Sequence, residues 1–338
     1  MPTFHPSNPL VTDIDAGILA AQREVNVALA AFPHPDVRTP EGLQQLRLLT
    51  ANNKAGTVLE PLDRYVPTPG GDMRMRIFIP EDPVRAVFLR IHGGGHCAGM
   101  PEDDDSLNDL YARECHVVVA SPDYRLCPDI TLVEQIEDCV AAAEWLAMHA
   151  QSDYGTSTLL IGGISAGGYL AAATVLHLRE RNRAAFDMFV AAALDSGHYD
   201  LGRTASSWLA NDQTLVVTGK WIEAFWDLAL PGYDTEQRRV PRLSPMLNDL
   251  SGLPAALFTV GNLDPLRDES ILMAQRWQLA GSFADLDVWP EGAHAFSNMG
   301  TPLAQAAAQR TVAWLNSALE RNVAYSPVLQ AVSMQGSA

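Results

Sequence analysis

Residues 159–173 read L-L-I-G-G-I-S-A-G-G-Y-L-A-A-A, and this stretch decides the fold. An apolar run typical of a buried strand enters a Gly-x-Ser-x-Gly pentapeptide, and an alanine-rich run typical of a helix leaves it. Such a sharp strand-to-helix turn lifts its serine clear of the sheet, while Gly163 and Gly167 leave room for the tight backbone. A serine hydroxyl is a poor nucleophile until a base takes its proton, so base and substrate must both reach it. The stretch therefore predicts that Ser165 is a nucleophile.

Short apolar runs alternate with helical patterns on both sides of this turn. The predicted strands are 59–67, 73–79, 86–91, 117–120, 159–162, 189–194, 255–260 and 284–289. The predicted helices among them are 134–149, the run after Ser165, 270–280 and 303–319. This alternation implies an α/β fold in which a mainly parallel sheet is covered by helices on both faces.

Two parts of the chain do not follow the alternation. Residues 13–32 and 39–51 have amphipathic helical patterns before the first strand. Residues 200–250 carry many aromatic side chains, namely Trp208, Trp221, Phe225, Trp226 and Tyr233. A surface excursion packed only on itself is one interpretation, but so many aromatic residues favour a helical insertion that forms a lid or cap with the N-terminal helices. We expect five segments: 1–56 (N-terminal part of the cap), 57–199 (first part of the core), 200–250 (cap insertion), 251–322 (second part of the core) and 323–338 (a C-terminal tail, frayed or disordered).

The composition limits the classes of function. The 338 residues are 47% apolar, which suits one large domain with an accessory part, and the net charge of −17 argues against a nucleic-acid or anionic-membrane partner. The N-terminus lacks the basic and apolar regions of a secretory signal, and no run approaches ~18 apolar residues, so we expect a cytoplasmic protein. The four cysteines have no Cys-x-x-Cys spacing and are expected to be buried free thiols, without a metal or disulfide.

A second motif, Ile91-His-Gly-Gly-Gly95, ends the predicted strand 86–91. Consecutive glycines free backbone N–H groups to point at one oxygen, and attack on a carbonyl places negative charge on such an oxygen. We therefore expect an oxyanion hole made by Gly94 and Gly95, with Ala166 as a third donor. A phosphate site is the alternative, but the spacing lacks Gly-x-Gly-x-x-Gly and Gly-Lys-Ser/Thr. His92 is expected to brace the loop through hydrogen bonds.

A base and an acid are expected downstream, at the carboxyl ends of strands. Asp264 follows the strand 255–260, whereas Asp268 and Glu269 look like first-turn acids of the next helix, stabilised by its dipole. His294 follows the strand 284–289, and no other histidine is assigned a catalytic position. The order Ser165, Asp264, His294 differs from that of chymotrypsin-like and subtilisin-like enzymes.

Five ordered motifs resemble those of the hormone-sensitive-lipase-like (bacterial family IV) esterases of the α/β-hydrolase fold. They are His92-Gly-Gly-Gly95, Asp123-Tyr-Arg-Leu-Cys-Pro128, Gly163-x-Ser-Ala-Gly-Gly168, Asp264-Pro-Leu-Arg-Asp268 and Gly292-Ala-His-Ala-Phe296. The resemblance covers about residues 58–322. It implies an eight-stranded, mostly parallel sheet, a helical cap, no metal or cofactor, and hydrolysis of small-molecule carboxylic esters. It also implies structural roles for Asp105 and for the turn that contains Tyr124.

The sequence departs from this family at the pocket. Ile164 stands where the family usually has Asp or Thr, and His96 and Cys97 stand where an aromatic or aliphatic residue is usual. We expect all three to line the substrate pocket, and we hypothesise that His96 and Cys97 bias substrate choice. Cys127 replaces a common small residue and is interpreted as a packing change.

The resemblance implies acyl transfer through a Ser165 acyl-enzyme, with short- to medium-chain esters as substrates. Lactones, amides, carbamates and acetyl groups stay open as alternatives, because a triad does not select the leaving group. A non-catalytic binding protein on the same fold is a further alternative, which the presence of His294 disfavours. A triacylglycerol lipase is disfavoured by the lack of a long apolar lid. The sequence does not give the oligomeric state, and a homodimer stays open.

Overall fold

The structure is a computed structural model that describes residues 10–50 and 56–335, with side chains up to residue 322. Three predictions fall partly outside these residues. They concern the targeting signal over residues 1–9, the junction of cap and core at 51–55, and the end of the tail at 336–338.

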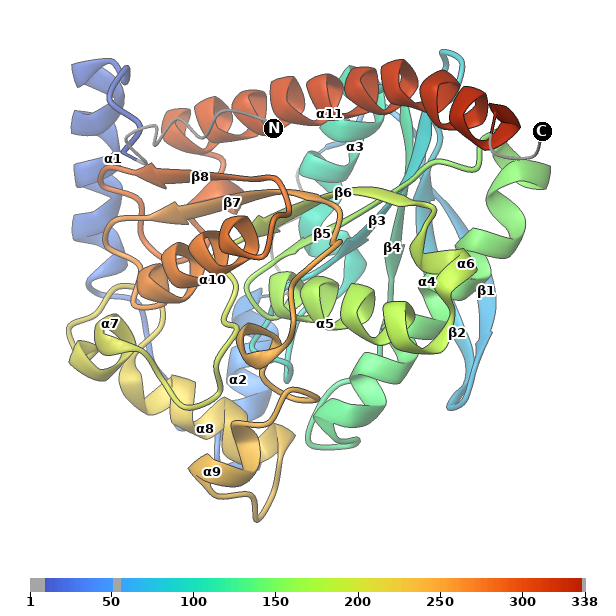
Figure 1. The fold of residues 1–338 in the computed structure, drawn as a ribbon. Helices are drawn as coiled ribbons and strands as arrows, with labels where there is room; N and C mark the ends of the chain where they lie inside the picture. Colours follow the sequence, from blue (N-terminus) through green and yellow to red (C-terminus); the bar gives the residue numbers. More distant parts are fainter. Residues whose placement is uncertain (1–9, 51–55, 336–338) are drawn as a thin grey trace.

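An eight-stranded sheet forms the centre of the molecule, with the order β1-β2-β4-β3-β5-β6-β7-β8 (Figure 1). The strands are β1 (Leu62–Thr68), β2 (Gly71–Phe78), β3 (Ala86–Ile91), β4 (Val117–Pro122), β5 (Leu159–Ile164), β6 (Phe189–Asp195), β7 (Ala255–Gly261) and β8 (Ala284–Trp289). β2 is antiparallel to both β1 and β4, whereas all pairings from β4–β3 through β7–β8 are parallel. The predicted α/β architecture with a mostly parallel sheet is therefore confirmed.

The central strands are apolar throughout because helices cover them on both sides. Every residue of β3, β4 and β5 is buried, as expected for parallel strands between two helical layers. Side chains of β3 alternate between the layers: Val87 and Leu89 join one apolar cluster and Phe88 joins another. Parallel strands also bring their carboxyl ends to one edge of the sheet, and this edge holds the predicted site.

Helices form the two covering layers. One layer contains α4 (Leu132–Tyr154), α5 (Ala166–Arg181) and α10 (Arg267–Leu279), with the short α6 (Arg183–Phe186) beside α5. The other contains α3 (Asp105–Cys115) and α11 (Pro302–Gln335), which runs along the top of Figure 1.

Two helices differ from the sequence predictions. α3 was not expected, because the four acids at residues 102–105 resemble a polar loop. In the structure, these acids lie in the 3₁₀ turn Pro101–Asp104 and in the first turn of α3. Acidic side chains favour the start of a helix, because the helix dipole is positive there. α11 continues to Gln335, through the stretch expected as a frayed tail. The backbone of that stretch stays helical in spite of Pro327, which has no N–H to donate within the helix, so local sequence pattern did not predict the continuation.

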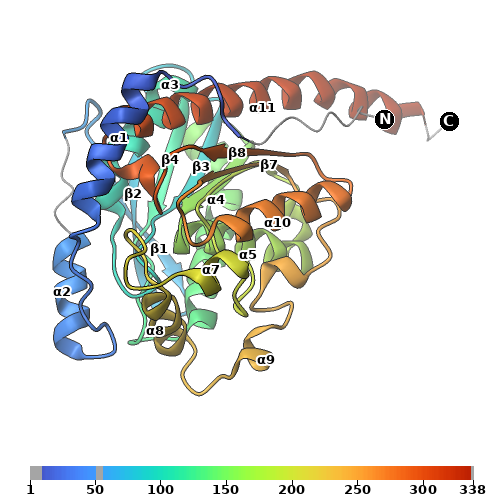
Figure 2. The same cartoon turned by 90° about the vertical axis from the view of Figure 1, so that its left-hand side faces the viewer.

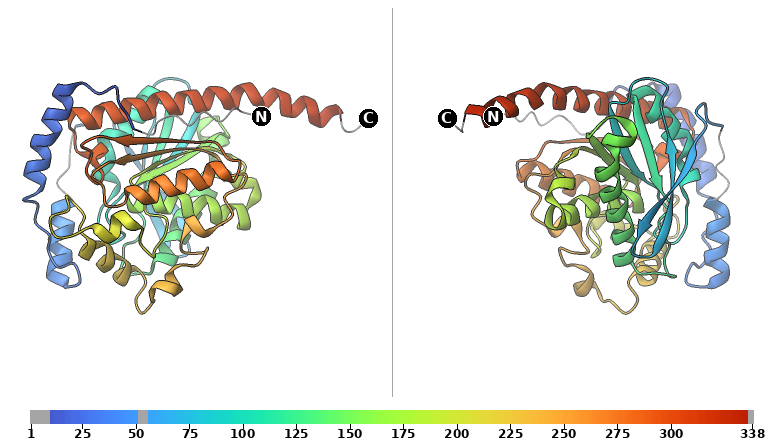
Figure 3. Two further views of the ribbon diagram at one scale, coloured as in Figure 1. Left: turned by 60° about the vertical axis from the view of Figure 1, so that its left-hand side comes forward. Right: turned by 90° about the vertical axis from the view of Figure 1, so that its right-hand side faces the viewer.

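The remaining helices lie at the carboxyl edge of the sheet, beside and below it in Figure 2. They are α1 (Ala16–Leu29), α2 (Pro40–Thr50), α7 (Ala205–Leu209), α8 (Gly219–Ala229) and α9 (Thr235–Arg238). Trp221 of α8 donates its indole N–H to the carbonyl of Pro35, 2.9 Å away, which joins the N-terminal segment to the insertion. The views in Figure 3 show α1 and α2 on the same side of the body.

Arg47 fastens this N-terminal segment to the core. Its Nε donates to the carbonyl oxygen of Cys97 at 2.9 Å, and its Nη2 donates to that of Cys127 at 3.3 Å. The cap helix α2 is therefore bonded to the loop that follows the three glycines.

No helix among the described residues combines the length and apolar character needed to cross a bilayer.

Candidate active site

Ser165 lies in the turn between β5 and α5. Its φ is 56°, a backbone conformation that residues other than glycine rarely adopt. A Cβ atom on Gly163 would lie 2.4 Å from the carbonyl oxygen of Ile91, and one on Gly167 would lie 2.0 Å from the same oxygen. Both glycines are therefore required by the close approach of β3. The amide of Ser165 donates to the carbonyl of Asp195 at 2.8 Å, so the end of β6 holds the strained turn in place.

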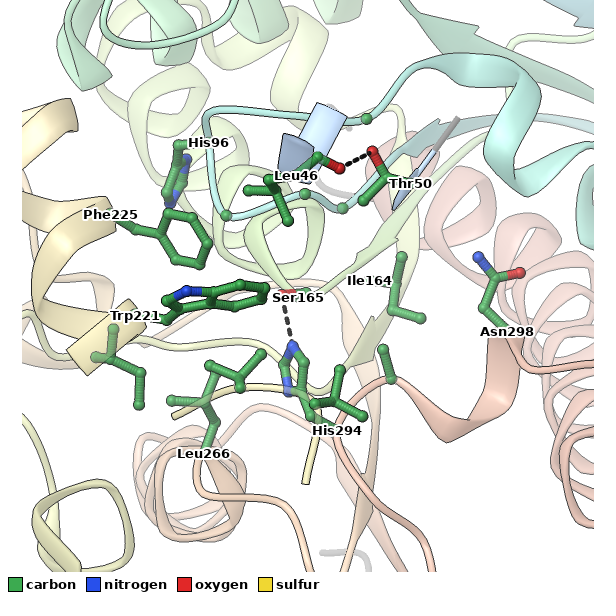
Figure 4. Close-up of a pocket in the computed structure, with 18 of the residues that line it drawn as sticks. Leu46, Thr50, His96, Ile164, Ser165, Trp221, Phe225, Leu266, His294 and Asn298 are labelled. Atoms are coloured by element: carbon green, nitrogen blue, oxygen red, sulfur yellow. Dashed lines mark hydrogen bonds between the residues drawn. The ribbon is translucent and has the colours of Figure 1, made fainter. Parts of the chain in front are cut away.

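The three residues predicted from strand ends meet at one point. Ser165 Oγ lies 2.8 Å from His294 Nε2, and His294 Nδ1 lies 3.0 Å from each carboxylate oxygen of Asp264. Because a carboxylate only accepts, Nδ1 carries the imidazole proton and Nε2 is free to accept the serine proton. Figure 4 shows the contact between Ser165 and His294 as a dashed line.

Local contacts fix the acid and the base. Asp264 accepts the amide of Leu266 at 2.7 Å, which orients its carboxylate at the end of β7. The loop before His294 lies so close to β7 that a Cβ on Gly261 would be 2.0 Å from the carbonyl oxygen of Gly292. Burial lowers the pKa of His294, but the charge and hydrogen bond of Asp264 outweigh burial and leave that pKa above its usual value.

Asp195 is a second buried acid beside the triad, and the sequence predictions missed it. It accepts hydrogen bonds from Ser297 Oγ at 2.5 Å and Ser196 Oγ at 2.9 Å. Burial raises the pKa of Asp195 to about 6 against the opposing effect of these hydrogen bonds. Its position at the carboxyl end of β6 was the available signal.

The glycine loop borders the same cavity as Ser165. Gly94 has a φ of 120°, and a Cβ there would lie 1.9 Å from the carbonyl oxygen of Ala98, so only glycine fits. Among the described residues, the N–H groups of Gly94, Gly95 and Ala166 donate to no other group. These three donors, expected from the sequence, are thus available to a bound oxyanion.

His92 braces this loop, as predicted. Its Nδ1 donates to the carbonyl of Gly93 at 2.8 Å, and its ring stacks on Tyr124 with centroids 4.2 Å apart. Tyr124 in turn donates its hydroxyl to the carbonyl of His92 at 2.9 Å. Asp105 also has the structural role expected for it, since it binds Arg76 through two hydrogen bonds of 2.8 and 2.7 Å.

A cavity of about 430 Å³ opens onto Ser165. Core and cap both line it: Gly94, Gly95, His96, Ile164, His198 and Leu266 come from the core, and Leu46, Trp221, Phe225 and Trp226 come from the cap (Figure 4). Two of the predicted cap aromatics, Trp208 and Tyr233, do not line it; their side chains are 64% and 43% exposed.

Two of the three predicted pocket residues line this cavity. Ile164 and His96 do, whereas Cys97 does not: it is fully buried in the apolar core, where burial raises the pKa of its thiol to about 12. The expected role of Cys97 in the pocket wall is therefore corrected. His96 has a φ of 67°, so the backbone turns there and the neighbouring side chains point to different surroundings.

Other lining residues were not predicted. Asp103 and Asp104 border the cavity, and Asp104 forms a buried ion pair with Arg90 of β3 at 2.6 Å. Asn298 donates to Asp104 at 2.8 Å and lies at the opposite wall from His96 in Figure 4. His198 was interpreted as an ordinary histidine, although it follows β6 at the carboxyl edge.

Within residues 10–50 and 56–322, no three His, Cys, Asp or Glu side chains are grouped to hold a metal ion.

Comparisons with known proteins agree with this geometry. A family model for the alpha/beta hydrolase fold matches residues 88–298. The carboxylic ester hydrolase LipN of Mycobacterium tuberculosis is 30% identical over 305 residues, covering 85% of this chain and 72% of that protein.

Solved structures of esterases are also similar to this chain. A bacterial heroin esterase is 27% identical, with a TM-score of 0.80 and coverage of 90% of this chain and 97% of that chain. An esterase from the bacterial hormone-sensitive lipase family is 25% identical, with a TM-score of 0.75 and coverage of 90% and 99%. The chain therefore belongs to the α/β-hydrolase fold family, as the resemblance to hormone-sensitive-lipase-like esterases predicts.

Proposed function

We propose that this protein is a serine carboxylesterase that hydrolyses short- to medium-chain esters through an acyl-enzyme. The observation that carries the proposal is the unbroken chain of hydrogen bonds from Ser165 through His294 to Asp264, at 2.8 and 3.0 Å, at the base of the cavity. Relatives that bear the names carboxylic ester hydrolase and esterase support it.

The first half-reaction forms the acyl-enzyme. His294 Nε2 takes the proton of Ser165 as the serine oxygen attacks the ester carbonyl. Asp264 keeps the imidazole in the required tautomer and stabilises the imidazolium. The N–H groups of Gly94, Gly95 and Ala166 receive the oxyanion, and one such donor typically contributes ~10²–10³ in rate. His294 then protonates the departing alcohol.

The second half-reaction releases the acid. His294 removes a proton from water, the resulting hydroxide attacks the acyl carbon, and the same three donors hold the second oxyanion. Ser165 leaves as the protonated hydroxyl, with its proton returned by His294. The two half-reactions balance without a metal ion or a redox partner.

The cavity supports the choice of short- to medium-chain esters. Its volume of about 430 Å³ lies near the lower end of the ~300–1,000 Å³ usual for ligand pockets. Trp221 and Phe225 of the cap lie beside Ser165 in Figure 4 and line the cavity, and both are buried. We place the reaction in the cytoplasm, because the four cysteines are free thiols, as is usual in a reducing compartment.

The test compares wild type with Ser165→Ala on p-nitrophenyl esters of increasing acyl length and on a matched anilide. We expect wild-type turnover to be highest for short to medium acyl chains, and Ser165→Ala to lower kcat by about 10⁶-fold with an unchanged melting temperature. Near-normal activity of the folded variant contradicts the proposal. Lack of turnover by wild type would instead favour the binding protein.

A further inference from the structure

A pair of buried histidines forms part of the cavity wall that the proposed mechanism does not use. His96 Nε2 lies 3.1 Å from His198 Nε2, and both side chains border the cavity. His96 is 1% exposed and His198 is 6% exposed. The ring of His198 stacks on Tyr169, with centroids 4.8 Å apart, so its orientation is fixed by packing.

Gln135 of α4 determines which atoms of this pair carry protons. Its Nε2 lies 2.7 Å from the carbonyl oxygen of His96 and 2.9 Å from that of Arg125. Two carbonyl oxygens can only accept, so the amide nitrogen must face them and the orientation of the amide is settled. The amide oxygen Oε1 then faces His96 Nδ1 at 2.9 Å and can only accept from it.

The protons along the chain follow from this one acceptor. His96 Nδ1 carries a proton, so in the neutral ring His96 Nε2 is an acceptor. His198 Nε2 must then donate to it across the 3.1 Å contact. In neutral His198 the remaining nitrogen, Nδ1, is therefore an acceptor without a proton.

Both rings are held neutral by their surroundings. Burial lowers the pKa of His96 to about 4, against the opposing effect of Gln135. Burial also lowers the pKa of His198 well below its usual value, and the neighbouring His96 and His294 lower it further. The pair thus adds a hydrogen-bonding group to the cavity without adding a charge.

We infer that His198 Nδ1 is an acceptor subsite for a hydroxyl or amide N–H on the ester substrate. Within the described part of the chain, Nδ1 has no hydrogen-bond partner, yet it is not among the fully buried unpartnered atoms, so it keeps accessible surface; the cavity is the space that His198 borders. The ring of Trp226 lies 6.2 Å from that of His198, and Phe225 lines the same cavity; neither side chain carries a hydrogen-bond acceptor. The inference rests on the proposed function and makes His198 a specificity-determining residue that Gln135 positions.

The first test measures the proton positions directly, without activity. In ¹⁵N-histidine-labelled wild type at pH 7, we expect the His198 signals, identified by their loss in His198→Phe, to show a protonated Nε2 and a bare Nδ1. Gln135→Met should allow the His96 and His198 tautomers to mix, which a merely structural glutamine would not cause. A protonated Nδ1 of His198 in wild type overturns the inference.

The second test measures selectivity with pairs of esters that exchange a hydroxyl for a methyl. The pairs are p-nitrophenyl 3-hydroxybutyrate with 3-methylbutyrate, and 2-hydroxypropyl acetate with 2-methylpropyl acetate. We expect wild type to favour the hydroxyl ester of at least one pair, and His198→Phe to lower that kcat/KM ratio by about twofold to tenfold, the effect of one hydrogen bond.

His149→Phe is the matched control, because His149 of α4 also stacks on an aromatic ring, that of Trp145 at 4.4 Å, and lies outside the cavity lining. Its ratios should equal those of wild type. Unchanged ratios in His198→Phe for both pairs overturn the inference while leaving esterase activity intact. If wild type hydrolyses none of the four esters, the proposed function fails, and the tautomer measurement still decides whether the wall presents an acceptor.

Discussion

The two walls of the cavity are built by different principles. The core wall consists of strand ends and glycine turns, whose positions are fixed by backbone contacts such as that of Gly163 with Ile91. The cap wall consists of side chains from α2 and α8, such as Leu46 and Phe225, which join the apolar cluster of the core through side-chain packing. The core wall therefore supplies atoms at defined positions for chemistry, and the cap wall supplies shape. Substitutions on the two walls should differ in which kinetic parameter they change.

The largest effect is expected for Asp264→Asn on the core wall. The amide would no longer favour the useful tautomer, and kcat should fall by about 10⁴-fold. The wild-type kcat/KM should fall as the pH drops through the pKa of His294, which Asp264 raises above its ordinary value of about 6.5, because only the neutral imidazole accepts the serine proton. In the variant, this midpoint should move to lower pH. Stopped assays across pH check both effects, and an unshifted midpoint contradicts the assigned role of Asp264.

A smaller effect is expected for Gly94→Ala, also on the core wall. The new Cβ would lie 1.9 Å from the carbonyl oxygen of Ala98, so the loop must move and its N–H groups must leave the oxyanion. We expect a decrease of about 10²–10³ in kcat with little change in KM. Gly56→Ala, where no atom lies within 4 Å of the new Cβ, is the control for a glycine substitution alone. Equal kcat values for the two variants would exclude Gly94 from the oxyanion hole.

The smallest effect is expected for Phe225→Ala on the cap wall. Removal of the ring enlarges the cavity beside Gly95, so the kcat/KM of a hexanoate ester relative to an acetate ester should rise by about 10-fold. The pH midpoint should stay as in wild type, because no catalytic proton lies in the cap. Trp208→Ala, on the exposed α7, should leave acyl preference unchanged. A Phe225→Ala variant that keeps the wild-type acyl preference would show that the cap does not limit chain length.

The sequence predicted the core wall better than the cap wall for a physical reason. Ser165, Asp264 and His294 each follow a strand that is recognisable from a short run of residues, and parallel strands must bring their ends together. The prediction of an α/β fold rests on these same local patterns, whereas the order of the strands in the sheet does not. By contrast, the exposure of Trp208 depends on contacts between distant segments, which no local pattern contains.

The errors within the core have a similar origin. Cys97 follows His96 in sequence, but the positive φ of His96 turns the chain and places the thiol in the apolar core. His198 and Asp195 follow a strand as His294 does, yet neither sits in a recognisable motif. Their importance depends on Gln135 and Ser297, which are far away in the sequence and are brought to them only by the fold.

The bonds from Arg47 to the carbonyls of Cys97 and Cys127 have a consequence for protein engineering. A chimera that takes its N-terminal helices from a relative replaces the part of the cavity wall that α2 forms. It also replaces Arg47, the donor that holds the segment after the oxyanion loop. Arg47 and both carbonyls should therefore come from the same parent, with the seam placed before α2 or after Cys127 and never between them.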